Sequence, residues 1–205
     1  MQDVVGRSIS LIHTVEGLEQ PVREVTLATD TCEGAFYLAT FDPSPFRIRQ
    51  GTEKDVDVIL DLIKGLAEYE KLAHEVTATP QKLREYLFGP KAGAEVVIGY
   101  SGDEPVGFAL FFPNYSTFLG QPGLYLEDLF VKSTWRNRGL GSQFLRHLAG
   151  IAVERGYGRM EWSVLDWNED AIRFYRKIGA RTMDDWKLCR LTGGALQTLA
   201  KDDNL

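Results

Sequence analysis

A six-residue segment, Arg136-Asn137-Arg138-Gly139-Leu140-Gly141, carries residue types that suit phosphate binding. Glycines let backbone amides approach a ligand, and the free amides in the first turn of a helix favour an anion. Lys132 adds positive charge beside the two arginines in a chain whose formal net charge is −6. The alternative is that the glycines only shape a tight turn, and the segment is not the GxGxxG pattern of dinucleotide-binding proteins. We interpret the segment as a pyrophosphate site.

The elements expected around this segment place it between a strand and a helix. Residues 124–131 have the composition of a strand, and the helix after the loop should bury one face. That face consists of Phe144, Leu145, Leu148, Ala152 and Val153. Further along, the sequence predicts a strand at 160–165, a helix at 170–178 closed by Gly179, and a last strand at 186–191. Strand, glycine-bearing loop and helix in this order form a phosphate cradle.

The first half of the chain predicts further strands and helices. A strand at 46–50 precedes a loose capping box at 52–55, which should start an amphipathic helix. The buried stripe of that helix is expected to be Val56, Ile59, Leu60, Ile63 and Leu66. Thr79 and Pro80 predict a second helix that runs to Gly89, and strands follow at 95–100 and 106–112.

Composition excludes several classes of function. The 205 residues, 44% of them hydrophobic, suffice for one well-filled core. The acidic net charge disfavours binding to nucleic acid or to an anionic membrane surface, and no apolar run approaches the roughly 18 residues that span a bilayer. Cys32 and Cys189 are far apart and lack metal-ligand or CxxC spacing, so we expect no metal site and a reducing, cytoplasmic location.

Several segments outside the loop make the chain similar to a known family. They are residues 66–72 (LAEYEKL), 125–128 (YLED), 164–168 (VLDWN), 174–175 (FY) and 179–180 (GA), and residues 136–141 match the [Q/R]xxGx[G/A] motif. Together they resemble the GNAT superfamily of N-acetyltransferases. Within it the chain is similar to the diamine branch of spermidine/spermine and thialysine acetyltransferases, and most similar to the thialysine enzymes. The resemblance implies an α/β (α+β) fold, in which helices flank a mixed central β-sheet.

The resemblance also divides the chain. It covers about residues 46–191, so we expect a GNAT domain at 46–205 and an N-terminal extension of unknown role at 1–45. Within the extension, alternation at 7–12 and 22–27 predicts edge strands, and the prolines at 42–45 predict a break.

The resemblance implies two catalytic residues. An alkyl ammonium of pKa about 10.4 must lose a proton before it attacks a thioester, and the family assigns that proton to Glu127, through a water molecule. Tyr175 occupies the position of the acid that protonates the leaving thiolate. The alternative for Glu127 is a structural carboxylate beside Asp128, and without the family an aromatic at the spacing of Tyr175, beside Phe174, is more often a core residue than a catalytic one.

The resemblance further implies that acetyl-CoA is the acetyl donor, held by one strand and two loops. These cofactor-binding residues are Leu129, Phe130, Val131, Arg136, Asn137, Arg138, Gly139, Leu140, Gly141, Ser142, Asn168, Glu169, Asp170 and Ala171. The chain departs from the family at Ala171, where a serine is frequent, so one side-chain contact is missing.

The positions that match the family's amine site carry carboxylates and aromatics, which suit an ammonium group. They are Tyr69, Glu70, Glu127, Asp128, Glu161, Trp162 and Ser163. Polyamine-specific relatives carry an acid and a tryptophan in the loop that here reads YSTF at 115–118. The loop therefore favours a short amine such as thialysine or lysine over spermidine or spermine.

Two other functions stay open from the sequence. One is acetylation of protein lysines, and the other is a non-catalytic sensor of acyl-CoA, which the joint presence of Glu127 and Tyr175 disfavours. The resemblance also implies a homodimer formed through C-terminal elements.

Overall fold

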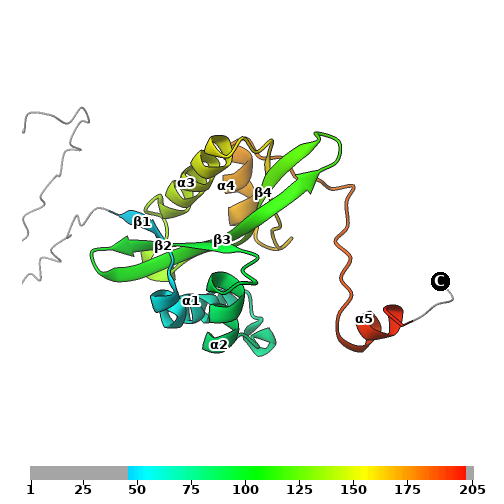
Figure 1. The fold of residues 1–205 in the computed structure, drawn as a ribbon. Coiled ribbons are helices and arrows are strands. Elements are labelled where there is room, and N and C mark those ends of the chain that lie inside the picture. Colours follow the sequence, from blue (N-terminus) through cyan, green and yellow to red (C-terminus); the bar gives the residue numbers. More distant parts are fainter. Residues whose placement is uncertain (1–45, 202–205) are drawn as a thin grey trace, which may run out of the picture. The chain divides into compact units, whose positions relative to one another are not determined.

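The computed structural model describes residues 46–201, and these form a mixed β-sheet flanked by helices, as expected for the fold class (Figure 1). The sheet has the order β1-β2-β3-β4-β5, antiparallel except for the parallel pair of β4 and β5. Its strands are β1 (Arg47–Gln50), β2 (Glu95–Ser101), β3 (Glu104–Ser116), β4 (Gln121–Val131) and β5 (Met160–Trp162). The expected strands at 7–12 and 22–27 lie outside the described residues.

Helices cover both faces of the sheet (Figure 1). On one face lie α1 (Val56–Tyr69), α2 (Pro80–Leu83) and the π-helical turn Arg84–Phe88 that continues α2. On the other lie α3 (Leu140–Glu154) and α4 (Glu169–Lys177). The two cores have Phe108 and Phe144, respectively, at their centres, and both side chains are fully buried.

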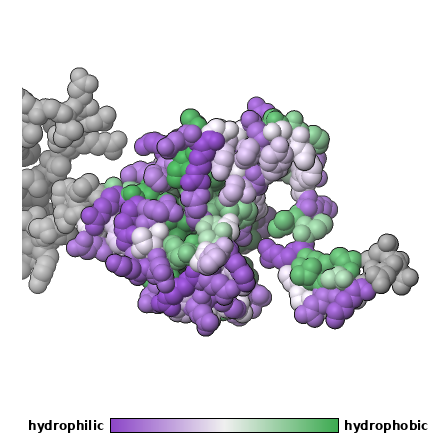
Figure 2. Space-filling model, in the orientation of Figure 1, coloured by the Kyte–Doolittle hydropathy of each residue, from purple (hydrophilic) through white to green (hydrophobic). Residues whose placement is uncertain are grey.

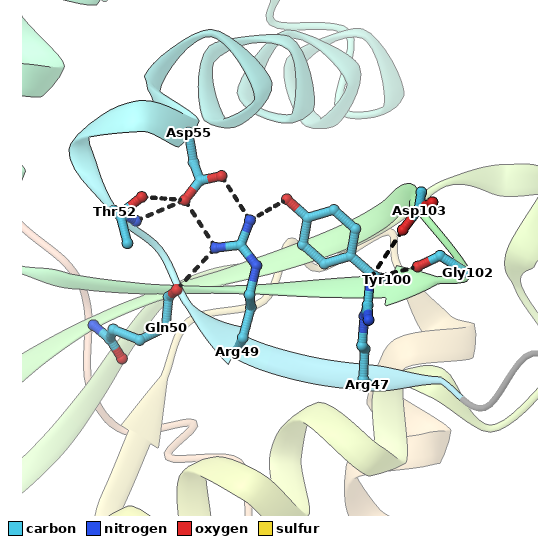
Figure 3. Close-up of polar contacts among 8 residues, drawn as sticks. All are labelled: Arg47, Arg49, Gln50, Thr52, Asp55, Tyr100, Gly102 and Asp103. Atoms are coloured by element: carbon cyan, nitrogen blue, oxygen red, sulfur yellow. Dashed lines mark hydrogen bonds and ion pairs between the residues drawn. The ribbon is translucent and has the colours of Figure 1, made fainter.

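A polar network fixes the start of α1 against the sheet (Figure 3). Arg49 on β1 donates to both carboxylate oxygens of Asp55, at 2.8 and 2.7 Å, and to the hydroxyl of Tyr100 on β2, at 2.8 Å. The amide and hydroxyl of Thr52 also donate to Asp55, which confirms the expected capping box. The Arg49 guanidinium, followed by Thr52, holds the pKa of Asp55 well below its usual range despite burial. The network therefore ties β1, β2 and α1 together.

Two expected core positions are less buried than predicted. In α1 Leu62 is buried, whereas Ile63 is only half-buried at the margin of the same core, because consecutive residues of a helix point about 100° apart. In α3 Ala152 is buried, but Val153 is 79% exposed in the last turn of the helix. The rest of each predicted stripe is buried as expected.

The C-terminal region differs most from the sequence prediction. Strand β5 ends at Trp162 instead of 165, and residues 186–191 form no strand. Alternating apolar residues form a strand only where a neighbouring strand offers hydrogen bonds, and none within residues 46–201 pairs with this segment. A short helix that the sequence did not predict, α5 (Gly193–Leu199), follows it. Within the described residues, no helix is long and apolar enough to cross a membrane.

Candidate active site

Glu127 stands out on β4 because the pairing with β3 shifts there. Asp128 lies opposite Leu110 and Leu126 lies opposite Phe111, so Glu127 is the extra residue of a β-bulge. A bulge redirects side chains, and here it leaves Glu127 exposed while the adjacent Asp128 is partly buried. The chain thus presents two consecutive carboxylates in two different environments.

A third carboxylate comes from the end of α1. Burial, with smaller contributions from the charges of Glu127 and Glu70, raises the pKa of Asp128 to about 6. Burial also raises the pKa of Glu70, the C-cap residue that follows α1. Glu127 and Glu70 both lie close enough to Asp128 for their charges to raise its pKa, and three carboxylates grouped in this way favour a cation.

Tyr175 lies on α4, on the face that packs against β5. Its ring meets Trp162 at 5.1 Å between centroids and Phe174 at 5.5 Å. Burial, and then the proximity of Tyr69, raises the pKa of the Tyr175 phenol. The hydroxyl is therefore a proton donor at neutral pH and above.

Strands β4 and β5 pair over only three residues each, so the two strands separate beyond that point. The pairing runs from Leu124 with Met160 to Leu126 with Trp162, and no further within the described part of the chain. Beyond that point Leu129, Phe130 and Val131 pair with β3 on one side alone. The side chain of Phe130 is buried, so that residue offers only its backbone. An extended ligand would find a strand edge here.

The loop after β4 has the geometry of a phosphate cradle. Asn137 and Gly139 adopt left-handed backbone conformations, with φ of 60° and 78°, and Gly139 is the N-cap of α3. Among residues 46–201 no side chain caps that helix, so its first amides, including those of Gly141 and Ser142, are free for an anion. The side chain of Leu140 is buried in the core.

Gly141 is informative because nothing in the fold requires a glycine there. Its φ is not positive, and a Cβ added to it would meet no atom of the described part of the chain within 4 Å. Open space on the helix N-terminal side is what the close approach of a pyrophosphate needs. The residues of the loop therefore fit the diphosphate of acetyl-CoA.

The two arginines of the loop point to different places. The guanidinium of Arg138 lies over the ring of Trp135, 4.5 Å from the centroid, on an exposed side chain. The guanidinium of Arg136 instead lies 3.9 Å above the ring of Tyr69, and its Nε donates to the carbonyl oxygen of Val131 at 3.0 Å. Arg136 is partly buried and turned back toward α1.

The second expected cofactor turn, at the start of α4, is largely engaged within the chain. The side-chain oxygen of Asn168 caps the helix by accepting from the amide of Ala171, at 3.3 Å. Asp170 forms an ion pair with Arg173, and Glu169 is an exposed first-turn residue. The structure thus gives Asn168 a capping role.

Three of the expected amine-binding residues, at β5 and directly after it, have partners within the chain. Glu161 pairs with Arg159 at 2.9 Å and accepts from Asn114 at 2.7 Å, so its charge is already compensated. Ser163 shares a hydrogen bond of 2.9 Å with Tyr125. Trp162 supports Tyr175, as described above.

The segment 115–118, on which the sequence-based choice between amines depends, is not wholly a loop, because β3 extends to Ser116. Ser116 is only 3% exposed, at the end of β3, and its Oγ accepts a hydrogen bond from Arg159 at 3.2 Å. A buried hydroxyl that faces a guanidinium is no partner for a distal ammonium group. The absence of an acid at Ser116 therefore does not discriminate between amines, and the preference for a short amine stays a prediction.

Trp167 is a residue near the site that the sequence did not single out. Its ring lies 6.0 Å from that of Tyr69, between centroids. The only signal was its place in the segment 164–168, which the family resemblance already included. Trp167 brings the loop before α4 against the end of α1.

Comparison with known proteins agrees with this geometry. A model of the Acetyltransferase (GNAT) family matches residues 61–180. The chain is 34% identical over 200 residues to L-ornithine N5-acetyltransferase NATA1 of Arabidopsis thaliana, covering 76% of this chain and 88% of that protein. It is also 34% identical over 164 residues to thialysine N-epsilon-acetyltransferase of Bos taurus, covering 75% of this chain and 96% of that protein.

A solved structure, the V. cholerae integron cassette protein VCH_CASS6, is 27% identical, with a TM-score of 0.66 over 77% of this chain and 98% of that one. The chain therefore belongs to the GNAT acetyltransferase family. It is an enzyme that transfers an acetyl group to an amine.

Proposed function

We propose that this enzyme acetylates the side-chain amine of a short amino acid such as thialysine, ornithine or lysine. The observation that carries the proposal is the group of three carboxylates, Glu70, Glu127 and Asp128, beside the open edge of β4. This group attracts a cationic amine and holds it beside the strand that would receive the acetyl donor. The names of the two 34%-identical relatives support a short amino acid.

Each residue of the site has a proposed role. The exposed Glu127 accepts the proton of the ammonium group, through water, since it is the carboxylate that reaches solvent. Asp128 and Glu70 orient the amine. Tyr175 donates a proton to the departing sulfur, and burial keeps its phenol protonated until then.

Acetyl-CoA, the proposed acetyl donor, supplies an activated thioester carbonyl. The amides at the start of α3 and the space beside Gly139 and Gly141 would hold its diphosphate. The free edge of β4 at Leu129–Val131 would pair with its extended arm.

A polyamine substrate is the second candidate, because three carboxylates in one place also suit a polycation. Release of free coenzyme A thiol separates the two. Acetyl-CoA would be supplied with thialysine, ornithine, lysine, spermidine or a lysine-containing peptide. We expect the highest kcat/KM with one of the three amino acids. A preference for spermidine or for the peptide would refute the short-amine proposal and leave the acetyltransferase assignment intact.

We further propose a homodimer that involves the C-terminal segment. Apolar side chains between Met183 and Leu199 are exposed, among them Trp186 at 72% and Leu188 at 76%, and Figure 2 shows hydrophobic surface on α5. Burial against a second copy would remove this surface from water. Light scattering should therefore give twice the chain mass, and the variant Trp186→Ser should shift the equilibrium toward monomer. A monomeric wild type would refute the dimer.

The acetyltransferase domain is proposed to be residues 46–205, since the family match and the site both lie within it. Removal of residues 1–45 should then leave kcat/KM within about twofold. Loss of turnover in a folded truncated enzyme would show that the extension contributes to catalysis.

A further inference from the structure

Arg136 begins the proposed phosphate loop, yet its side chain does not face that loop. The guanidinium stacks on Tyr69 at the end of α1, at 3.9 Å, and the Nε donates to Val131 at the end of β4, at 3.0 Å. One partly buried side chain thus joins the last residue of a helix to the last residue of a strand.

The backbone explains this direction. Asn137 turns the chain immediately after Arg136 by adopting a left-handed conformation, and Gly139 turns it again. Residues 137–139 are exposed as a result, while Arg136 remains on the inner side. Arg138, two residues along, stacks on a different ring, that of Trp135.

Tyr69 is a shared component of the amine site. Trp167 contacts its ring at 6.0 Å between centroids, and Tyr69 lies near enough to Tyr175 to raise the pKa of that phenol. The next residue, Glu70, is one of the three carboxylates. The position of the Tyr69 ring therefore affects both the proposed acid and the proposed amine ligand.

The cation that lies on the Tyr69 ring is therefore the guanidinium of Arg136 and not a substrate ammonium group. A guanidinium at 3.9 Å covers one face of the ring and supplies a cation–π contact there. A substrate ammonium has no room on that same face. This geometry gives Tyr69 a role in holding Arg136 and not, on that face, in binding the amine.

We propose that Arg136 is a positioning residue that couples the cofactor loop to the amine site through the ring of Tyr69. This inference rests on the proposed function. An occupied loop fixes the backbone of Arg136, which holds Tyr69 and hence Glu70 in place for the amine. By linkage, a bound amine must strengthen cofactor binding by the same factor.

Two matched variants test the coupling. Arg136→Lys keeps the charge but loses the planar stack on Tyr69. We expect it to raise the KM of the amine roughly five- to tenfold at saturating acetyl-CoA, with the Kd of acetyl-CoA for the amine-free enzyme changed less than twofold. Arg138→Lys should instead raise the Kd of acetyl-CoA and leave the KM of the amine nearly unchanged at saturating acetyl-CoA, because the Arg138 side chain lies on the exposed side of the loop. Calorimetry supplies the Kd values.

Conservative and disruptive changes of the partner ring complete the test. Tyr69→Phe keeps the stack and should raise the KM of the amine less than Tyr69→Leu, which removes the stack. Arg136→Lys combined with Tyr69→Leu should be no worse than the poorer single variant, because one contact is lost once. Additive effects in the double variant would overturn the proposal.

Failure of the proposed function is distinguishable from failure of the coupling. If no amine is turned over by the wild type, the proposed function fails, and calorimetry with acetyl-CoA alone still decides the role of Arg136. A weakened acetyl-CoA affinity in Arg136→Lys, equal to that in Arg138→Lys, would make Arg136 a phosphate ligand and overturn the inference.

Discussion

The ring of Tyr175 meets the ring of Trp162 edge-on, at 5.1 Å between centroids and 68° between planes. Trp162 is the last residue of β5 and the last to pair with β4. The phenol of Tyr175 is therefore held at the point where the two strands part. An acid at this position would face an extended ligand bound along β4.

Tyr175→Phe removes the hydroxyl and keeps the ring that packs on Trp162. If Tyr175 protonates the leaving thiolate, kcat should fall by roughly 10²- to 10⁴-fold, with the Kd of acetyl-CoA little changed. Tyr115→Phe is the control, since Tyr115 is 61% exposed at the far end of β3. Equal turnover in Tyr175→Phe and wild type would return Tyr175 to a packing role.

Gly141→Ala should change stability and affinity in opposite directions. An alanine in the first turn of α3 meets no neighbour among the residues that the structure describes, so it should stabilise the fold by up to about 1 kcal/mol through helix propensity. The same methyl group should obstruct the diphosphate and weaken acetyl-CoA binding.

Gly150→Ala is the matched control for this variant, because Gly150 lies in the same helix and also has open space around it. It should stabilise without loss of affinity. Urea unfolding and calorimetry measure the two quantities. Unchanged acetyl-CoA affinity in Gly141→Ala would argue against the loop as the phosphate site.

The raised pKa of Asp128 should make the free energy of unfolding depend on pH. This pKa is raised to about 6 in the fold, so between pH 4 and 6 the unfolded chain releases this proton first, and folding stability falls as pH rises. Asp128→Asn removes the effect. The variant should gain on the order of 2 kcal/mol relative to wild type between pH 4 and pH 7.5. Urea unfolding at both pH values measures the gain, and a constant difference would contradict the raised pKa.

The order of elements from 46 to 179 was predictable because each is encoded locally. The capping box at Thr52 and the left-handed Gly179 fix helix ends through their own backbone chemistry. The segment 186–191 has the right alternation for a strand, but a strand requires a partner, and partners are not visible in local pattern.

The site shows the same division. Glycine positions in the loop follow from backbone chemistry, whereas the direction of the Arg136 side chain depends on Tyr69, 67 residues earlier in the chain. The hydrogen bond between Asn114 and Glu161 likewise depends on how β3, β4 and β5 align. Spacing along the sequence carries no information on such contacts.

Proton removal by Glu127 is the central claim of this account, and the pH dependence of Glu127→Gln tests it most directly. Release of coenzyme A thiol would be followed from pH 6 to 10 with acetyl-CoA and the best amine of the panel. Without the base, only substrate amine that is already neutral in solution can react, and this is a fraction of roughly 10⁻³ at pH 7. We predict that kcat/KM of Glu127→Gln falls by 10- to 10³-fold at pH 7 and approaches the wild-type value as pH nears that of amine deprotonation. A variant whose pH profile is parallel to that of the wild type would contradict the account.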